Sequence, residues 1–329
     1  MRRLTVREER WPLREPFVIS RMRQDEAEVV VVEIEADGCR GRGEADACLD
    51  GPDAAPVALT VEAVREAVEA GAGRAALCRM MPAGPARNAL DCALWDLEAK
   101  QAGRPVWALA GLTAPGPVTT VLTIGLGTPE AMARTAAAEA GRAVLKLKLG
   151  RAEGDLDRVA AVRRAAPEAR LIVDANTGWG PQLLAEILPG LAALGVALVE
   201  QPLAPGADAA LLEITGQDRP IPIAADESVT DLASLPALIG RYECVNVKLD
   251  KTGGLTEGLA LVAAARKAGM GVMIGCNLGT SLAMAPGVLL AQGAEVVDLD
   301  GPLLLARDRQ PGLVYQASEV LPPDAVLWG

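Results

Sequence analysis

The sequence predicts an α/β protein: a (β/α)-barrel of the modified TIM-barrel kind, with an α+β domain before it in the chain. Between residues 116 and 311, short apolar segments alternate with Ala- and Leu-rich helical segments, and eight such apolar segments occur. Polar residues end these segments at regular intervals, with 26 positions from Lys148 to Asp174 and 26 from Asp174 to Glu200. Because one βα unit has about this length, the repeat favours parallel strands closed into a barrel.

Residues 1–115 have a different pattern, and we expect them to form an α+β capping domain. Residues 29–36 (VVVVEIEA) are followed by Asp37 and Gly38, which is typical of the two-residue turn of a β-hairpin. Residues 86–103 repeat leucine and alanine at helical spacing, which predicts an amphipathic helix. Strands and helices are therefore mixed in this part of the chain.

The barrel should span residues 116–311, and residues 312–329 should form a tail that returns to the capping domain. Pro115 and Pro117 mark the boundary between the two domains. We expect a helix after each of the first seven strands, as in a closed parallel barrel. The eight expected strands are residues 118–124, 143–149, 170–175, 196–200, 221–225, 244–249, 271–275 and 295–300.

The composition narrows the chemistry that the chain can perform. The sequence has no histidine, and its net charge is -11 at pH 7. Without imidazole, His-ligated zinc sites and Ser-His-Asp triads are excluded, so proton transfer falls to Lys, Asp, Glu, Tyr or Cys. The negative charge argues against nucleic acid as a partner.

The cysteines and the N-terminal segment predict a cytoplasmic protein. The six cysteines form no CxxC pair, which favours free thiols in a reducing compartment. The N-terminal residues lack the apolar stretch of a signal peptide. No window approaches ~18 uninterrupted apolar residues, so we expect no membrane span.

Three carboxylates, Asp174, Glu200 and Asp226, end consecutive predicted strands. Alternate residues of a strand share a face, and the helix-facing side of a barrel strand is apolar, so these acids should point into the barrel. They would lie at the C-terminal mouth, where barrel active sites are built. Three acids repel each other unless a cation neutralises them, and oxygen ligands favour Mg²⁺, with Mn²⁺ as the alternative.

Two lysines end strands on opposite sides of the predicted barrel. Lys148 belongs to the second strand and Lys248 to the sixth. A substrate bound between them would have one amine on each face of its α-carbon. This arrangement suits removal of a proton from one face and its return on the other.

These motifs together resemble the muconate lactonizing enzyme subgroup of the enolase superfamily. The matching pieces are K-x-K, DAN, EQP, DES and a lysine on the sixth strand. NVKLDKTGGLTE (residues 246–257) and DLDGP (residues 298–302) resemble the dipeptide epimerases more closely. Over nearly its full length the chain is similar to epimerases of the L-Ala-D/L-Glu type.

The resemblance implies 1,1-proton transfer at the Cα of the C-terminal residue of an L-Ala-X dipeptide. L-Ala-D/L-Glu from peptidoglycan turnover would be the leading substrate. Two carboxylates on one strand face suit a free ammonium group. Members of the superfamily often form homo-oligomers, and the resemblance leaves that state open for this chain. The implied roles are Mg²⁺ ligands for Asp174, Glu200 and Asp226, acid/base catalysis for Lys148 and Lys248 with help from Lys146, α-ammonium binding for Asp298 and Asp300, and substrate contact for Thr123.

The capping domain should close the mouth with a loop that carries Arg21 and Arg23. Either arginine is a candidate to pair with a second substrate carboxylate, such as a glutamate side chain. The resemblance would place an arginine at Gln24, so the chain departs from the pattern there.

Other reactions that use the same lysines and metal stay open. They are N-acyl amino acid racemisation, o-succinylbenzoate synthesis and cycloisomerisation, and a non-catalytic binding barrel is a further alternative. Asp298 and Asp300 favour the dipeptide, because those other substrates lack a free α-ammonium group.

Overall fold

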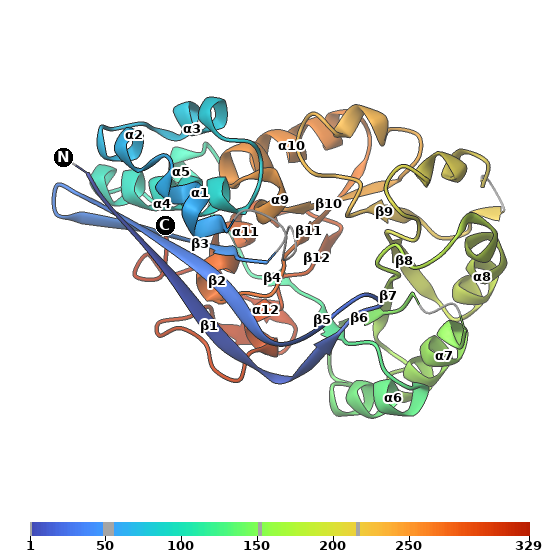
Figure 1. The fold of residues 1–329 in the computed structure, drawn as a ribbon. Coiled ribbons are helices and arrows are strands. Elements are labelled where there is room, and N and C mark those ends of the chain that lie inside the picture. Colours follow the sequence, from blue (N-terminus) through green and yellow to red (C-terminus); the bar gives the residue numbers. More distant parts are fainter. Residues whose placement is uncertain (1, 49–55, 151–152, 215–217) are drawn as a thin grey trace.

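The computed structural model describes residues 2–48, 56–150, 153–214 and 218–329. An antiparallel sheet of three strands belongs to the capping domain, and a parallel sheet of eight strands forms the barrel (Figure 1). One large apolar cluster contains side chains of both domains. This architecture confirms the predicted (β/α)-barrel with an α+β cap.

The capping sheet consists of β1 (Arg3–Val18), β2 (Arg23–Ala36) and β3 (Cys39–Asp46), paired in chain order. Asp37 and Gly38 both have positive φ, 52° and 77°, as a type I′ turn requires. The predicted hairpin is therefore confirmed. β1 and β2 form a long ribbon whose far end reaches the barrel (Figure 1).

The longest helix of the cap, α4 (Pro85–Ala102), packs directly on β3. It begins with proline and ends at Gly103, whose φ of 60° gives a left-handed C-cap, so the predicted helix is confirmed. Gly41 and Gly43 of β3 allow the contact, because a Cβ at either position would lie 2.1 Å from a carbonyl oxygen of α4. The shorter helices described in this domain are α1 (Val57–Glu62), α2 (Arg65–Glu69), α3 (Arg74–Met80) and α5 (Val106–Leu109).

The barrel strands pair in chain order, each parallel to the next. The sheet closes where the N–H group of Val121 donates to the carbonyl of Val297 at 2.9 Å. The first predicted strand is divided, because β4 (Val118–Thr119) pairs outside the barrel sheet. The eight strands are β5 (Leu122–Ile124), β6 (Val144–Lys148), β7 (Arg170–Asp174), β8 (Val196–Glu200), β9 (Ile223–Ala225), β10 (Cys244–Lys248), β11 (Gly271–Gly275) and β12 (Val296–Val297).

Helices cover the outside of the barrel, but the expectation of a helix after each of the first seven strands is wrong. In the described residues between β8 and β10, only short 3₁₀ helices occur. Pro202, Pro205 and Pro236 lie in these segments, and proline interrupts the hydrogen bonding of an α-helix. The helical elements are α6 (Pro129–Ala138), α7 (Asp155–Ala165), α8 (Pro181–Ala193), 3₁₀ turns at Asp208–Leu212 and Leu235–Ala237, α9 (Leu249–Thr252), α10 (Leu255–Lys267), α11 (Ser281–Leu290) and α12 (Gly301–Leu304).

The interior of the barrel has an apolar layer beneath a charged layer. On β7, Ile172 and Asp174 are two residues apart and share the inward face, and Leu198 and Glu200 do the same on β8. The apolar layer closes the lower part of the barrel, so the charged residues lie at its C-terminal mouth. The apolar residues are Val121, Ile172, Leu198, Ala224, Cys244, Met273 and Val296.

The C-terminal segment connects the two domains. β13 (Tyr315–Gln316) and β14 (Glu319–Val320) form a small antiparallel sheet with β4. The chain then reaches α4, where the indole N–H of Trp328 donates to the carbonyl of Cys92 at 3.0 Å. Both termini lie at the capping domain (Figure 1). Among the described residues, no helix has the length and apolar character needed to cross a membrane.

Candidate active site

Three carboxylates converge at the C-terminal end of the barrel. Asp174 and Glu200 end β7 and β8 and are direct partners in the sheet register, and Asp226 follows β9. Each side chain offers an oxygen, and these oxygens all lie within 4.8 Å of one another. The three residues are at most 3% exposed. The sheet therefore concentrates three negative charges where water hardly reaches them.

This donor set fits a hard divalent cation, because the ligand atoms are all carboxylate oxygens. Oε2 of Glu200 is buried without a hydrogen-bond donor, although Nζ of Lys146 lies 2.7 Å away at an angle unsuitable for a hydrogen bond. Burial, together with the charge of Asp174, raises the pKa of Glu200 to about 7. A bound Mg²⁺ or Mn²⁺ would coordinate this oxygen, which accepts no hydrogen bond, and would offset the repulsion between the acids.

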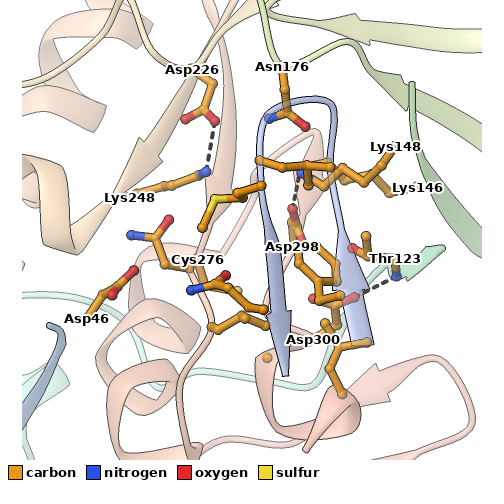
Figure 2. Close-up of a pocket in the computed structure, with 18 of the residues that line it drawn as sticks. Asp46, Thr123, Lys146, Lys148, Asn176, Asp226, Lys248, Cys276, Asp298 and Asp300 are labelled. Carbon is orange, nitrogen blue, oxygen red and sulfur yellow. Dashed lines mark hydrogen bonds and ion pairs between the residues drawn. The ribbon is translucent and has the colours of Figure 1, made fainter. Parts of the chain in front are cut away.

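Lys148 and Lys248 contact two different acids of this cluster. Nζ of Lys148 is 2.6 Å from Oδ2 of Asp174, and Nζ of Lys248 is 2.8 Å from Oδ2 of Asp226. Figure 2 shows the two lysine side chains entering from opposite sides, with their amino groups turned toward each other. A molecule held at the acids would therefore have an amine on each side.

The carboxylates around Lys248 favour its protonated form. Burial alone would lower the pKa of this lysine, but the carboxylates of Asp226 and Glu200, with the hydrogen bond to Asp226, together outweigh burial and raise it. A divalent cation on the acids would offset that carboxylate charge. The amine of Lys248 would then lose its proton more readily.

Lys146 lies deeper in the barrel and is 1% exposed. Its Nζ is 2.7 Å from Glu200, 2.7 Å from Asp298 and 3.3 Å from Asp174. Burial opposes its charge, but these carboxylates raise its pKa well above the usual value. It therefore stays cationic and joins the three acids to the second acidic group of the site.

That second group consists of Asp298 and Asp300, both 3% exposed. Oδ2 of Asp300 accepts a hydrogen bond from the backbone N–H of Thr123 at 2.6 Å. Burial, with the charge of Asp298, raises the pKa of Asp300 to about 7. The Cys276 thiol completes a cluster with these acids, but burial raises its pKa well above the usual value and keeps it neutral. The pair therefore suits an ammonium group better than a metal.

One cavity at the joint between cap and barrel connects these groups (Figure 2). The barrel supplies its charged floor, and the end of the β1–β2 ribbon supplies the opposite wall. Phe17 lies over Lys148, with Nζ 5.8 Å from the ring centre. The lining residues from the barrel include Thr123, Lys146, Lys148, Asn176, Asp226, Glu227, Lys248, Lys251, Cys276, Asp298 and Asp300, and those from the ribbon are Phe17, Ile19, Arg21, Met22 and Gln24.

The two arginines of the predicted loop lie in different places. Arg21 lines the cavity, and its guanidinium is 3.0 Å from Oε1 of Glu227. Arg23 pairs with Asp25 at 3.0 Å, and both side chains are more than 60% exposed. Arg23 is not among the described residues that line the cavity. β2 begins at Arg23, and successive side chains of a strand point to opposite sides. The side chain of Arg23 therefore points to solvent, while that of Gln24 faces the cavity.

Sequence reasoning missed two residues that position the acids. Nζ of Lys251 donates to Oδ1 of Asp226 at 2.6 Å, and Nδ2 of Asn246 donates to Oε1 of Glu200 at 2.7 Å. The Asn246 contact follows from strand alternation, because it shares the inward face of β10 with Lys248. Lys251 lies one helical turn beyond β10, where alternation gives no direction.

Comparison with known families covers most of the chain. Residues 1–111 match the family model described as mandelate racemase/muconate lactonizing enzyme, N-terminal domain. Residues 130–320 match the one described as enolase C-terminal domain-like. The first match lies within the capping domain, and the second spans most of the barrel and part of the C-terminal segment.

Two curated relatives are close in sequence. An L-Ala-D/L-Glu epimerase of Escherichia coli (strain K12) is 46% identical over 329 residues, which cover 97% of this chain and 99% of the relative. An N-acetyl-D-glutamate racemase of a Pseudoalteromonas species is 45% identical over 255 residues, which cover 77% of this chain and 79% of the relative.

Two solved structures share the whole fold. An enolase family member from Agrobacterium tumefaciens, described as homologous to dipeptide epimerases and holding sodium and L-Ala-L-Glu, has a TM-score of 0.95, 45% identity and 100% coverage of both chains. A dipeptide epimerase from Enterococcus faecalis, complexed with Mg and L-Leu-L-Tyr, has a TM-score of 0.89 and 28% identity, with 98% of this chain and 96% of that chain covered.

Proposed function

Because this chain belongs to the mandelate racemase/muconate lactonizing enzyme family of the enolase superfamily, we propose that it is a Mg²⁺-dependent dipeptide epimerase. The reaction is inversion at the Cα of the C-terminal residue of an L-Ala-X dipeptide, with L-Ala-D/L-Glu as the leading substrate. The observation that carries the proposal is the approach of Lys148 and Lys248 from opposite sides to one cluster of acids. The Escherichia coli and Agrobacterium tumefaciens relatives support the choice of dipeptide.

Asp174, Glu200 and Asp226 would hold Mg²⁺, which supplies stabilisation of the negative charge that develops on the substrate carboxylate as the α-proton leaves. Asp298 and Asp300 pair with the α-ammonium group of the dipeptide and fix its orientation. Thr123 contributes its backbone N–H to Asp300 and so positions that carboxylate. The substrate carboxylate then lies toward the acids and the ammonium toward the second pair.

The two lysines perform the proton transfer. For one epimer, a neutral amine on one face removes the proton from Cα, and the ammonium on the opposite face donates its own proton to the same carbon. The two lysines finish with their protonation states exchanged, and the configuration of Cα is inverted. Lys146 stays protonated between Glu200 and Asp298, where it adds positive charge beside the substrate carboxylate.

Racemisation of an N-acyl amino acid is the second candidate, because the Pseudoalteromonas relative is an N-acetyl-D-glutamate racemase. The acidic pair argues against it. An acyl group has no positive charge to offer the pair. Asp298 already has Lys146 as a partner. Asp300, however, accepts a backbone hydrogen bond from Thr123 and would keep a buried charge without a cation beside it, which costs free energy. A free ammonium group removes that cost.

The cellular setting belongs to the same proposal. Epimerisation of L-Ala-D/L-Glu would serve the turnover of peptidoglycan peptides in the cytoplasm. The free thiols described for all six cysteines suit a reducing compartment. A homo-oligomer is compatible with this activity, since the cavity is lined by residues of one chain.

The test is exchange of the α-proton in D₂O, followed by ¹H NMR. The purified protein with Mg²⁺ is expected to replace the Cα proton of the C-terminal residue in L-Ala-L-X dipeptides and to produce the other epimer. EDTA should stop the reaction, and Mg²⁺ should restore it. Exchange with N-acetyl-glutamate but with no dipeptide would favour the second candidate, and no exchange with either would overturn the proposal.

A further inference from the structure

The pair formed by Arg21 and Glu227 has no part in the proton transfer, yet both residues line the substrate cavity. We propose that this pair reads the side chain of the dipeptide's second residue and that it recognises a primary amide at least as well as a carboxylate. The enzyme would then accept L-Ala-Gln as efficiently as L-Ala-Glu. This inference rests on the proposed dipeptide epimerase activity.

The contact geometry leaves one donor group and one acceptor atom side by side. Nη2 of Arg21 is 3.0 Å from Oε1 of Glu227, which leaves the other guanidinium N–H groups for a ligand. Oε2 of Glu227 is buried and has no hydrogen-bond partner in the part of the chain that the structure describes. A primary amide is the complement of this arrangement, because its oxygen accepts from Arg21 and its N–H donates to Glu227.

Charge leads to the same substrate class. Glu227 neutralises Arg21, so the pair attracts a substrate carboxylate less than a free arginine would. A substrate carboxylate that accepts a hydrogen bond from Arg21 would also lie beside Oε2 of Glu227. Two neighbouring carboxylates repel each other. Gln24, which lines the same wall, adds an uncharged amide. Arg23 does not alter this balance, because it is exposed and paired with Asp25.

Arg21 and Glu227 lie where the side chain of the dipeptide's second residue would point. Arg21 comes from the loop at the end of the β1–β2 ribbon, and Glu227 directly follows the candidate metal ligand Asp226. A dipeptide with its carboxylate at the acids and its ammonium at Asp298 has its second side chain left to point toward the cap. Arg21 and Glu227 join cap and barrel on that side of the cavity.

The experiment compares kcat/KM for L-Ala-L-Gln and L-Ala-L-Glu, which differ by one group at the side-chain end. The wild-type ratio of Gln to Glu is expected to be about one or higher. Glu227→Gln removes the repulsion and leaves Arg21 with its full charge, so the ratio should fall roughly tenfold or more in favour of Glu. Arg21→Gln leaves Glu227 unpaired, so the ratio should rise by a similar factor.

The ratio cancels any uniform loss of activity, which is needed because Glu227 adjoins Asp226. Arg23→Gln is the matched control, since Arg23 is a cap arginine outside the described cavity lining, and its ratio should equal that of wild type. A wild-type preference for Glu above roughly tenfold, or a ratio that neither variant moves, would overturn the inference while leaving the epimerase assignment intact. If Glu227→Gln does not fold, the Arg21→Gln shift alone decides. Absence of exchange with every dipeptide would overturn both.

Discussion

Lys148 and Lys248 contact different acids on opposite sides of the cavity, so each should act on one epimer only. In Lys148→Ala the remaining lysine can still remove the α-proton of one epimer and return a solvent deuteron to the same face. We therefore expect epimerisation to fall by roughly 10³-fold or more, while exchange without inversion persists for a single epimer. Lys248→Ala should retain exchange for the opposite epimer. ¹H NMR of each pure epimer in D₂O measures both quantities.

Lys267→Ala is a suitable control for these variants, because this lysine lies at the end of α10 and is exposed. It should epimerise at the wild-type rate. If both active-site variants kept exchange of the same epimer, the two-sided assignment of the amines would be wrong.

Asp300 should impose a pH dependence on dipeptide binding. Burial and the charge of Asp298 raise its pKa to about 7, so it is increasingly protonated as the pH falls below about 7. A neutral carboxyl pairs poorly with an ammonium group, and kcat/KM at saturating Mg²⁺ should therefore fall on the acid side of pH 7. Asp300→Asn should raise KM for the dipeptide by roughly 10- to 100-fold, because a hydrogen bond to a charged group contributes about 1.5–3 kcal/mol.

The pH profile of Asp300→Asn separates this effect from a general loss of structure. The side chain at position 300 of the variant cannot titrate. The dependence of KM on pH below about 7, the acid limb of the profile, should therefore disappear, while the pH profile of kcat stays the same. An unchanged acid limb in the variant would assign that limb to another group.

At the scale of residues, the sequence could predict the side chains whose direction follows from strand alternation. Asp174 and Glu200 are the last residues of regular strands, so their inward direction depends only on the period of two. Lys251 and Glu227 lie beyond strand ends, where the direction of a side chain depends on the local turn. The place of Arg23 depends on the residue at which β2 begins, and no local pattern marks that residue.

At the scale of elements, the contact between β3 and α4 depends on two glycines. A Cβ at Gly41 would lie 2.1 Å from the carbonyl oxygen of Ala93 and 2.5 Å from the backbone nitrogen of Leu97. Backbone atoms cannot move aside as a flexible side chain can, so the helix must shift. We expect Gly41→Ala to lower the free energy of unfolding by about 2 kcal/mol or more, as overpacking of a close contact does.

Urea denaturation measures this change, and Gly141→Ala is the control. A Cβ at Gly141 would meet nothing within 4 Å, so that variant should stay within about 0.5 kcal/mol of wild type. Equal stability of Gly41→Ala and the control would show that α4 can move away from β3 at little cost.

Elements with local signals could be predicted, whereas those set by packing could not. The β2–β3 turn needs positive φ at Asp37 and Gly38, and α4 begins at Pro85 and ends before Gly103, so residue types mark each boundary. The prolines between β8 and β10 are not a sufficient marker of the missing α-helices, because α8 and α11 also contain a proline. The barrel repeat predicts helices there, and only the tertiary structure shows that short 3₁₀ turns cover those strands.

At the scale of the whole molecule, cap and barrel are joined by polar contacts as well as by the shared core. Glu44 of β3 accepts hydrogen bonds from the backbone N–H of Thr280 at 2.7 Å and from Arg309 at 2.7 Å. Thr280 ends the loop after β11 whose residues line the cavity. The cap also places Phe17 over Lys148. The site is therefore complete only when both domains are docked.

A second such joint, between α4 and α10, should make stability depend on pH. The N-terminus of α10 has glycine, Gly254, at its N-cap, and Asp91 of α4 caps it instead by accepting from the N–H of Thr256 at 2.9 Å and from its hydroxyl at 2.6 Å. Asp91 is 1% exposed, and burial raises its pKa to about 6 despite these hydrogen bonds. The folded state therefore binds the Asp91 proton more tightly than the unfolded chain, in which the value is 3.8.

Because the folded pKa is the higher one, the contribution of Asp91 to stability is fully present below about pH 4 and is lost as the pH rises through about 6. A difference of about two pKa units corresponds to about 3 kcal/mol. Asp91→Asn stays neutral at every pH and keeps an oxygen acceptor for Thr256. The free energy of unfolding of the variant, minus that of wild type, should thus increase by about 2 kcal/mol between pH 4 and pH 7.5, since part of the total is already lost at pH 4. Urea denaturation at several pH values measures this difference, and Glu15→Gln serves as a control at an exposed acid. A difference that stays constant with pH would show that the pKa of Asp91 is no higher in the folded protein than in the unfolded chain.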